Sequence, residues 1–460
     1  MQYHITFLDQ QFESLMAHLF SLEGNEQAAF LLGRQAVAPN STTILIQKVI
    51  PVEAPDVIEA SHVHMAIKSQ AYLRAIKRAD LTGDSVLFVH SHPPGVPDFS
   101  AQDDREEAAL FKTAYIRIKH GAIHGSLVFS GKDLFRGRVW LPDGTHVRIQ
   151  STRVIGNRFQ YLFSEPLSDR PLEYFDRQAR VFTSDLQPVL KRLHIGVVGA
   201  GGTGSAVCEQ LIRLGIGKLT VVDAGTFESS NVNRVYGSSV FDETLPKVNI
   251  VARVAAGIGL GTELTHVQGH LSFRSVTEKL LDCDIVFGCT DDEWGRSILN
   301  RVALRYCIPV FDMGVNIDTD RGKILSIQGR VTTLLPGAAC LFCRRRISAD
   351  RVRAESISAT DPEEAAKLKK EGYLVGIDEP APAVISFTTA IAAAAVSEFL
   401  HRLTGFQGSD RKSTEVIVFF DQSRIRTNST PPSPDCLCAD ETKWGTGDTS
   451  RFLDLNWRPE

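Results

Sequence analysis

The stretch HSHPPGVPDFSAQD, residues 90–103, carries the clearest chemical signal in the chain. It holds a His-x-His pair, His90 and His92, followed by a Ser-x-x-Asp group, Ser100 and Asp103. The segment SVLFVHSH predicts a strand that ends at the histidines, and AQDDREEAALFKTA predicts a helix whose first turn contains Asp103. A catalytic zinc takes three such protein ligands and leaves its fourth position to water. The stretch therefore predicts a zinc site made by His90, His92 and Asp103.

This spacing resembles that of the JAB/MPN-type (JAMM) zinc isopeptidases, which remove ubiquitin or ubiquitin-like proteins or trim their tails. The family also has a glutamate seven residues before a glycine that closes a strand, and NEQAAFLLGR supplies Glu26 and Gly33. The resemblance implies an α/β metallopeptidase domain. Glu26 would be the general base for the zinc-bound water, and Ser100 would donate a hydrogen bond to the tetrahedral oxyanion. Such a donor stabilises the developing charge by roughly 3 kcal/mol.

Other interpretations of the histidines remain open at this point. His90 and His92 could be surface residues on a proline-rich turn. A second pair, His62 and His64, has no following Ser-x-x-Asp group and is interpreted as the solvated start of a helix. His120 and His124 lack a carboxylate in motif spacing and are predicted to be structural.

Length and composition limit the classes of protein that fit. A chain of 460 residues exceeds one ordinary domain. The net charge of -4 gives no basic excess, so we expect neither nucleic acid nor an anionic membrane as a partner. The first residues, MQYHITFLDQ, lack a secretory signal, and we expect a cytoplasmic protein. The apolar segment AVISFTTAIAAAAVSEFL contains Ser386 and Glu398 and is predicted to be a helix buried against a sheet.

The predicted organisation has four parts. Residues 1–150 form the isopeptidase domain, 151–170 a linker, 171–440 a second domain, and 441–460 a polar tail that orders only on binding.

The second domain opens with IGVVGAGGTGSAVCEQLIRLGIGKLTVVDA, which predicts a strand, a glycine-rich turn, a helix and a strand ending at Asp223. The turn fits G-x-G-x-x-G, in which glycines allow a tight turn, close approach to phosphate and helix packing. Phosphate would lie at the positive end of the helix. These glycines are Gly199, Gly201, Gly202 and Gly204. This segment alone predicts a NAD-binding protein equally well.

Four later segments distinguish the two interpretations: GTFESSNVNRVYG, LPKVNI, VFGCTDD and LPGAACLFCRRR. In this order they resemble the ubiquitin-activating-enzyme-like (ThiF-type) adenylyltransferases, which have a Rossmann-like α/β fold. These enzymes use ATP and Mg²⁺ to join AMP to the C-terminal carboxylate of a ubiquitin-like or sulfur-carrier protein that ends in glycine. The chemistry needs cations, because a carboxylate attacks an anionic phosphate.

The resemblance assigns roles to individual residues of this chain. Asp223 would bind the ribose, and Asp291 would coordinate magnesium. The phosphates would be held by Asn231, Arg234 and Lys247.

Upstream, EYFDRQARVFTSDLQ resembles the family's first helix, whose arginine reaches the ATP of the other subunit. Here that residue is Arg177, and the motif's earlier arginine is absent, with Tyr174 and Phe175 nearby. The resemblance implies a homodimer with Arg177 acting in trans. The alternative is a surface arginine on an amphipathic helix.

The eight cysteines fall into two groups. Cys340 and Cys343 match the family's first zinc pair, and Cys436 with Cys438 form a Cys-x-Cys where the family usually has Cys-x-x-Cys. Together they predict a closed structural zinc site, the alternative being two unrelated thiol pairs. The remaining cysteines are predicted to be small core residues; they are Cys208, Cys283, Cys289 and Cys307.

The family often carries its thioester cysteine in the loop after the first zinc pair, but residues 347–380 contain none. Either the acyl-adenylate passes directly to an acceptor, or another cysteine serves. The charged composition of this loop predicts an exposed crossover segment that could wrap a partner's tail.

The two resemblances together predict a fusion that cleaves ubiquitin-like precursors or conjugates and adenylates the exposed carboxylate. A conjugating enzyme is a further expected partner, which would receive the activated ubiquitin-like protein. Prokaryotic conjugation and sulfur-carrier systems contain fusions of this type, and antiviral defence is one setting considered. Three alternatives stay open: sulfur-carrier activation in cofactor or amino-acid biosynthesis, a NAD-dependent oxidoreductase, and a non-catalytic module that binds ubiquitin-like proteins.

Overall fold

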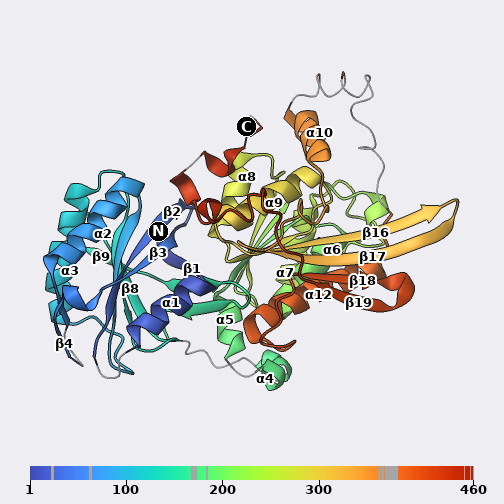
Figure 1. Ribbon diagram of the computed structural model, residues 1–460. Coiled ribbons are helices and arrows are strands. Elements are labelled where there is room, and N and C mark those ends of the chain that lie inside the picture. Colours follow the sequence, from blue (N-terminus) through green and yellow to red (C-terminus); the bar gives the residue numbers. More distant parts are fainter. Residues whose placement is uncertain are drawn as a thin grey trace. The chain divides into compact units, whose positions relative to one another are not determined.

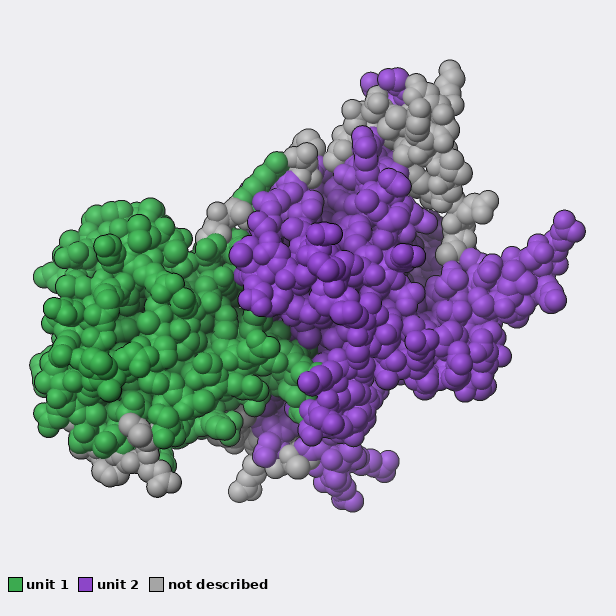
Figure 2. All heavy atoms as spheres, in the orientation of Figure 1, with its two compact units in different colours: residues 1–167, 445–452 green, residues 168–444, 453–460 purple. Residues whose placement is uncertain are grey.

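The computed structural model describes residues 1–21, 25–61, 65–166, 173–182, 185–360, 363, 367, 382–449, 451–455 and 457–458. The chain divides into two compact units (Figures 1 and 2). Unit 1 contains Met1–Leu167 and Gly445–Phe452, and unit 2 contains Ser168–Trp444 and Leu453–Glu460. Both units are α/β structures, as predicted.

Unit 1 is built on a nine-stranded sheet of order β11-β10-β1-β3-β2-β6-β7-β8-β9, and β4 and β5 form a separate two-stranded sheet. The strand predicted from SVLFVHSH is confirmed as β6, which pairs with β2 on one side and β7 on the other. The strands are β1 (Gln2–Leu8), β2 (Ala28–Val37), β3 (Ser41–Pro51), β4 (Val57–Ala60), β5 (Met65–Ile67), β6 (Ser85–Ser91), β7 (His124–Phe129), β8 (Phe135–Trp140), β9 (His146–Arg148), β10 (Ser151–Ile155) and β11 (Gln160–Phe163).

Helices cover both faces of this sheet because each carries an apolar stripe. In α1 (Asp9–Leu19) the buried residues Phe12, Leu15 and Leu19 recur at helical spacing and join the core on one face. On the other face, α2 (Ser69–Thr82) and α3 (Ala101–Arg117) pack into a second core with residues of β2 and β6. The predicted helix after the histidines is therefore confirmed as α3.

The structure corrects two boundaries of unit 1. The segment expected to be a linker, residues 151–170, begins with β10 and β11, and β10 pairs in parallel with β1. Part of the expected tail also belongs to this unit, since the Val37 amide donates to Asp448 Oδ2 at 2.6 Å and Gln47 Nε2 donates to the Gly445 carbonyl at 2.9 Å. Both segments form hydrogen bonds with strands that lie far away in the sequence. A local sequence pattern does not reveal such pairing.

Unit 2 is built on an eight-stranded sheet of order β14-β13-β12-β15-β16-β17-β18-β19. Its first five strands are parallel and the last three are added antiparallel. Strands β16 and β17 extend as a long hairpin beyond the rest of the sheet (Figure 1). The strands are β12 (His194–Val198), β13 (Lys218–Asp223), β14 (Glu263–Gln268), β15 (Ile285–Gly288), β16 (Val310–Asp320), β17 (Lys323–Leu334), β18 (Glu415–Phe419) and β19 (Arg424–Asn428).

The helices of unit 2 include the predicted helix after the glycine-rich turn, which is α6. The apolar segment forms α12, which packs on α6 and on β16 and β17, and no helix in the described ranges is long and apolar enough to cross a membrane. The helices are α4 (Asp176–Phe182), α5 (Leu186–Arg192), α6 (Gly202–Arg213), α7 (Lys247–Ile258), α8 (Arg274–Glu278), α9 (Glu293–Arg305), α10 (Ala349–Thr360) and α12 (Ile385–Thr404).

Two glycines make the turn before α6 possible. Gly199 has φ +95°, and a Cβ there would lie 2.6 Å from the Cys289 carbonyl oxygen. A Cβ at Gly204 would lie 1.8 Å from the Gly199 carbonyl oxygen. The ends of β12 and β15 can therefore approach the start of α6 closely. This point is where the chain segments that follow neighbouring strands run to opposite faces of the sheet.

Candidate functional site

The predicted zinc ligands of unit 1 converge on one point. His90 ends β6, His92 follows it, and Asp103 lies in the first turn of α3. His90 Nε2 lies 3.0 Å from His92 Nε2 and 3.3 Å from Asp103 Oδ1. One ligand atom from each of the three residues lies within 4.8 Å of the others. Strand, loop and helix thus bring together the three donors of the motif.

The chemistry of this donor set fits a zinc ion. Each imidazole has its Nε2 turned toward the other, and a shared cation satisfies both lone pairs together with the carboxylate. His92 Nδ1 lies 3.2 Å from the Val96 carbonyl, which orients that ring with Nε2 facing inward. Burial alone would raise the pKa of Asp103, but hydrogen bonds and charge from His90, with hydrogen bonds from Ser100, hold that pKa well below its usual range.

Glu26 and Ser100 lie beside these ligands. Glu26 is buried, and its Oε1 is 3.8 Å from His92 Nε2. Ser100 is the N-cap of α3, where its Oγ accepts the Asp103 amide at 3.2 Å and donates to Asp103 Oδ2 at 2.7 Å. The Ser-x-x-Asp spacing therefore has a second explanation, because it also forms a capping box.

Gly33 corrects one detail of the sequence interpretation. It lies within β2 and does not close the strand. A Cβ at Gly33 would lie 2.5 Å from Ile44 Cγ2, at the irregularity in the pairing of β2 with β3. A glycine is needed at residue 33 because β2 and β3 pack closely there, and Glu26 lies just before the start of β2.

The ligands open into a pocket of about 380 Å³. Its wall combines acidic and apolar side chains, which suits an extended peptide better than a large anion. Besides the motif residues, the wall contains Met65, Phe88, Pro93, Val96, Asp98, Phe99, Gln102 and Glu106.

The sequence analysis missed a buried polar cluster behind this pocket. Glu107, on α3, accepts hydrogen bonds from Arg138 Nε and Trp140 Nε1, each at 2.9 Å, and from Ser126 Oγ. The Arg138 guanidinium also lies 3.9 Å from the centre of the Phe99 ring, which lines the pocket. No motif spacing joins these residues, since they come from different elements.

In unit 2, the Asp223 carboxylate organises the end of the parallel sheet. Its Oδ2 accepts the Ala200 amide and its Oδ1 accepts the Gly225 amide, each at 2.6 Å. A Cβ at Gly225 would lie 3.1 Å from both Asp223 Oδ1 and Lys247 Nζ, so both side chains lie against Gly225. The turn, the acidic side chain and a lysine ammonium thus lie together.

The other predicted phosphate ligands differ in their surroundings. Asn231 is buried, and its Oδ1 accepts the Glu228 amide at 3.3 Å. Arg234 Nη1 donates to the Ser230 carbonyl at 2.6 Å, and the Arg234 stem would lie 3.3 Å from a Cβ at Gly202, the first residue of α6. Gly201 precedes α6 without a side-chain cap. Arg234 therefore lies over the start of the helix that would receive a phosphate.

The two aspartates of CTDD are structurally distinct. Asp292 is the N-cap of α9, where it accepts the Gly295 amide and the Thr290 hydroxyl. Asp291 is exposed, at the carboxyl end of β15. The structure thus leaves Asp291, the predicted magnesium ligand, with its carboxylate toward solvent.

Arg177 is exposed on α4. The helix is held instead by its other residues: Gln178 Nε2 donates to the Leu214 carbonyl at 3.2 Å, and the Phe182 ring contacts Phe406. Phe175, just before α4, lies against Gly215. This attachment leaves the Arg177 guanidinium on the outer side of the helix.

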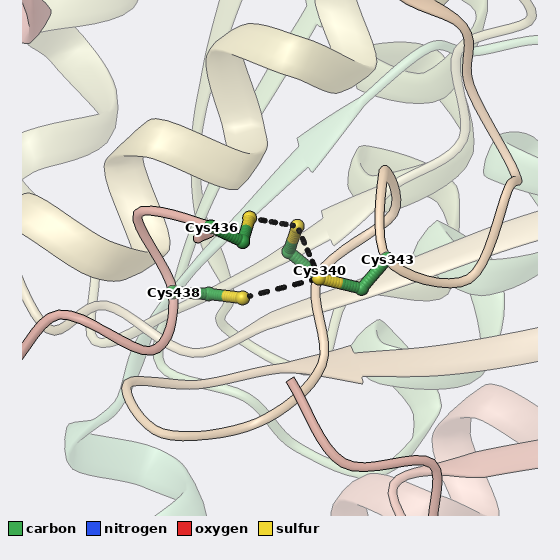
Figure 3. Close-up of side chains that lie close together, drawn as sticks. All are labelled: Cys340, Cys343, Cys436 and Cys438. Atoms are coloured by element: carbon green, nitrogen blue, oxygen red, sulfur yellow. Dashed lines mark hydrogen bonds between the residues drawn. The ribbon is translucent and has the colours of Figure 1, made fainter. Parts of the chain in front are cut away.

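The four grouped cysteines form one cluster (Figure 3). The Cys340 and Cys436 sulfurs lie 3.5 Å apart, as do those of Cys343 and Cys438. A hydrogen bond from Cys438 lowers the pKa of Cys340 to about 5, although burial opposes this shift. The Trp444 indole donates to the Cys438 carbonyl at 3.2 Å. Four sulfurs without disulfides fit a closed tetrahedral zinc site.

The single cysteines are unsuited to nucleophilic attack. Burial raises the pKa of both Cys208 and Cys289 well above the ordinary value. Part of the predicted crossover loop forms α10, and residues 361–362, 364–366 and 368–380 lie outside the described residues. Within the described part of the chain, every cysteine is thus either in the cluster or in a mainly buried position.

The remaining histidines are only partly described. His62 and His64 lie outside the described residues. His124 is fully buried in β7, and its Nδ1 accepts the Val86 amide at 3.1 Å. His120 lies on the surface, with its Nε2 3.2 Å from the Asp80 carbonyl. Both have structural surroundings.

Two family models match this chain. Residues 175–439 match the family model described as ThiF family. The chain belongs to the ThiF family. Residues 9–132 match the model described as prokaryotic homologs of the JAB domain, so this ThiF-family chain carries a JAB domain in its N-terminal part. The family match favours adenylation over the oxidoreductase interpretation of the glycine-rich turn.

Curated relatives of this ThiF-family chain resemble part of it. The SAMP-activating enzyme E1 of Haloferax volcanii is 30% identical over 147 residues, covering 32% of this chain and 51% of that protein. The molybdopterin-synthase adenylyltransferase of Escherichia coli is 28% identical over 185 residues, covering 39% and 71%. The sulfur carrier protein ThiS adenylyltransferase of Bacillus subtilis is 26% identical over 160 residues, covering 34% and 45%. The chain thus spans about half the length of the first of these relatives.

Proposed function

We propose that unit 2 adenylates the C-terminal carboxylate of a ubiquitin-like or sulfur-carrier protein that ends in glycine, using ATP and Mg²⁺. The observation that carries this proposal is that Asp223 and Lys247 both lie against Gly225, while Asp223 also accepts the Ala200 amide of the glycine-rich turn. A carboxylate of this kind holds ribose hydroxyls, and an ammonium next to a helix N-terminus attracts phosphate. The family membership and the names of the relatives support the same chemistry.

The proposed roles follow the charges that the reaction creates. Arg234 and Lys247 offset repulsion as the substrate carboxylate approaches the α-phosphate, and Asn231, three residues before Arg234, adds an amide contact to the phosphates. Asp291 would hold a magnesium ion, which would supply positive charge to offset the charge that develops on the leaving pyrophosphate. Arg177 contributes in trans within a homodimer, because its own helix leaves it facing outward.

We further propose that unit 1 is a zinc isopeptidase. The carrying observation is the convergence of His90, His92 and Asp103 in a pocket of about 380 Å³. When bound, zinc would supply a water whose pKa falls to about 7. Glu26, 3.8 Å from His92 Nε2, takes the proton of that water and returns it to the leaving amine. The Ser100 hydroxyl, which donates to Asp103 Oδ2 at 2.7 Å in this structure, turns to donate its one hydrogen to the oxyanion.

The fate of the adenylate has two candidates. The absence of a cysteine in residues 347–380 and the high thiol pKa of Cys208 and Cys289 favour direct transfer to an acceptor. That acceptor is a protein amine in a conjugation pathway, with or without a conjugating enzyme, or a sulfur donor in cofactor biosynthesis. The relatives named as molybdopterin-synthase and sulfur-carrier adenylyltransferases support the second candidate.

ATP–pyrophosphate exchange tests the adenylation proposal. The purified protein is assayed with small ubiquitin-like proteins, each offered as a precursor and as a form trimmed to its terminal glycine. We expect exchange with at least one trimmed form. Absence of exchange with every trimmed form, in protein with both metal sites loaded, would contradict the proposed activity.

The same assay tests the isopeptidase. If unit 1 supplies the substrate of unit 2, the precursor supports exchange with the wild-type protein and fails to do so with Glu26→Gln. The trimmed form should support exchange equally in both proteins. A sulfide donor that converts the adenylate to a thiocarboxylate, detected by mass spectrometry, distinguishes sulfur-carrier activation from protein conjugation.

A further inference from the structure

The two oxygens of the Glu107 carboxylate have different surroundings. Oε2 accepts three hydrogen bonds, from Arg138 Nε, Trp140 Nε1 and Ser126 Oγ. Oε1 is buried and has no hydrogen-bond partner. The structural contacts of Glu107 are therefore all made by one oxygen, and they do not account for the other, which is an acceptor of high capacity in a side chain only 2% exposed.

A buried nitrogen in the zinc site likewise lacks a hydrogen-bond partner, and it is a potential donor. His90 is 3% exposed, and its Nδ1 has no hydrogen-bond partner. Its Nε2 faces His92 and Asp103, so that nitrogen is the one available to a metal. An imidazole bound to a metal through Nε2 carries its proton on Nδ1, where it needs an acceptor.

The sheet places the acceptor and the donor in one region. His90 and Phe88 point to the same face of β6, and their rings stack at 5.3 Å. Ser126, which holds Glu107, lies opposite Phe88 in the pairing of β6 with β7, one step from His90 on that face.

Glu107 is also connected to the metal ligand Asp103, because both residues lie on α3. Glu107 lies one turn after Asp103 on the same side of the helix, since side chains four residues apart are neighbours. Fixing Glu107 to β7 and β8 therefore also fixes the turn that presents Asp103. The same side chain is in a position to orient a helix ligand and a strand ligand.

We propose that Glu107 is a positioning residue of the zinc site that accepts the Nδ1–H of His90 through one bridging water molecule, since neither Glu107 Oε1 nor His90 Nδ1 has a direct hydrogen-bond partner. This carboxylate–histidine pair would hold the His90 ring with Nε2 toward the metal and increase the basicity of that nitrogen. The inference rests on the proposed zinc isopeptidase and adds a residue that the motif does not contain.

The test is metal affinity in the Glu107→Gln variant. The amide oxygen of glutamine can keep the three donors at Oε2, and the amide nitrogen then meets the bridging water as a second donor beside the Nδ1–H of His90. We titrate metal-free protein with Co²⁺ and follow the visible d–d band of the histidine–carboxylate site, apart from the thiolate charge-transfer band of the cysteine cluster. The affinity of the first site should fall by about 10- to 100-fold, and that of the cysteine cluster should not change.

Ser126→Ala is the matched control, because it removes a donor to Oε2 and leaves Oε1 unchanged. We expect its Co²⁺ affinity to stay within about twofold of wild type. If Glu107→Gln does not fold, Arg138→Gln is compared with Arg138→Gln/Glu107→Gln, which isolates the carboxylate without the ion pair. An unchanged affinity in the variant that lacks the carboxylate, while wild type binds Co²⁺, overturns the inference alone. Absence of the d–d band in wild type would instead contradict the zinc site itself.

Discussion

Asp103 Oδ1 lies 3.3 Å from His90 Nε2, so the first turn of α3 and the end of β6 offer ligands to the same point. Ser100 caps the helix and holds the Asp103 carboxylate in this position at 2.7 Å. The ligand geometry is therefore built into the capped first turn of α3. A helix cap of this kind contributes about 1 kcal/mol to stability.

The first prediction concerns His92→Ala. Because His92 supplies one of three donors, the variant should lose one zinc per chain and all peptidase activity. Adenylation should remain, since the donors of the nucleotide site belong to unit 2. Zinc content by atomic absorption, peptide cleavage and pyrophosphate exchange are measured on the same sample. Retained cleavage would contradict the metal assignment.

The control for this prediction is His120→Ala, which changes a surface histidine and should keep both activities.

The second prediction separates the aspartates of CTDD. Asp291→Asn should abolish pyrophosphate exchange, because an amide is a poor magnesium ligand, and should leave peptide cleavage intact. Asp292→Asn should retain most of the exchange, since asparagine is as good an N-cap for α9 as aspartate. The two variants carry the same chemical change at adjacent positions. Equal loss in both would show that Asp292 has a role beyond capping.

The third prediction tests whether Arg177 acts in trans. Arg177→Ala and Asp291→Asn should each be inactive in exchange as homodimers. A mixed dimer contains one site with both native residues if the arginine crosses the interface, so mixing should restore part of the activity. The fraction of mixed dimer is verified by differently tagged subunits. No recovery in a verified mixed dimer would mean that Arg177 acts in its own subunit or not at all.

The fourth prediction concerns the cysteine cluster. Cys436→Ser should lose the second zinc and lower the melting temperature by about 10 °C, because a closed zinc site contributes folding free energy directly. Cys208→Ala is the control and should keep both zinc ions, since its thiol is packed in α6. A variant that loses zinc and keeps its melting temperature would contradict a structural role for the metal.

The parts of the fold that could be predicted are those with a local signal. SVLFVHSH and the glycine-rich segment have periodicities and punctuating residues that indicate strand, turn and helix without knowledge of their neighbours. The ligand set could be predicted as well, because His-x-His at a strand end and an aspartate in the first turn of a helix have little freedom of direction. The helix cap at Ser100 strengthens this signal.

The remaining features depend on partners that are distant in the sequence. The sequence predicts a linker where β10 lies, because this five-residue segment becomes a strand only beside β1. Gln150, just before β10, accepts the Tyr3 amide with its Oε1 at 2.6 Å. Residues 445–452 were interpreted as tail because their hydrogen bonds are made to β2 and β3. Glu107 was missed for the same reason. A glutamate on a charged helix is ordinarily solvated, and its burial is evident only from Arg138 and Trp140.

The last prediction concerns acid stability in unit 2. Glu415 is fully buried and accepts hydrogen bonds from Arg346 Nε at 3.0 Å and from Arg344 Nη1 at 3.3 Å. Burial would raise the pKa of Glu415, but the two arginines hold it below its ordinary value. A lowered folded-state pKa stabilises the fold above the unfolded value of about 4.3, and this contribution is lost as the pH falls further.

Glu415→Gln should therefore be less stable than wild type at pH 7 by about 3 kcal/mol, because two arginines lose their buried counter-ion. The difference should shrink as the pH falls below about 4, where wild type loses the same charge. Thermal unfolding followed by circular dichroism between neutral and acid pH measures both effects. Asp421→Asn, at an exposed carboxylate, is the control and should follow the wild-type curve. A difference between Glu415→Gln and wild type that stays constant with pH would show that the pKa of Glu415 is the same in the folded and the unfolded protein, which would contradict a lowered folded-state pKa.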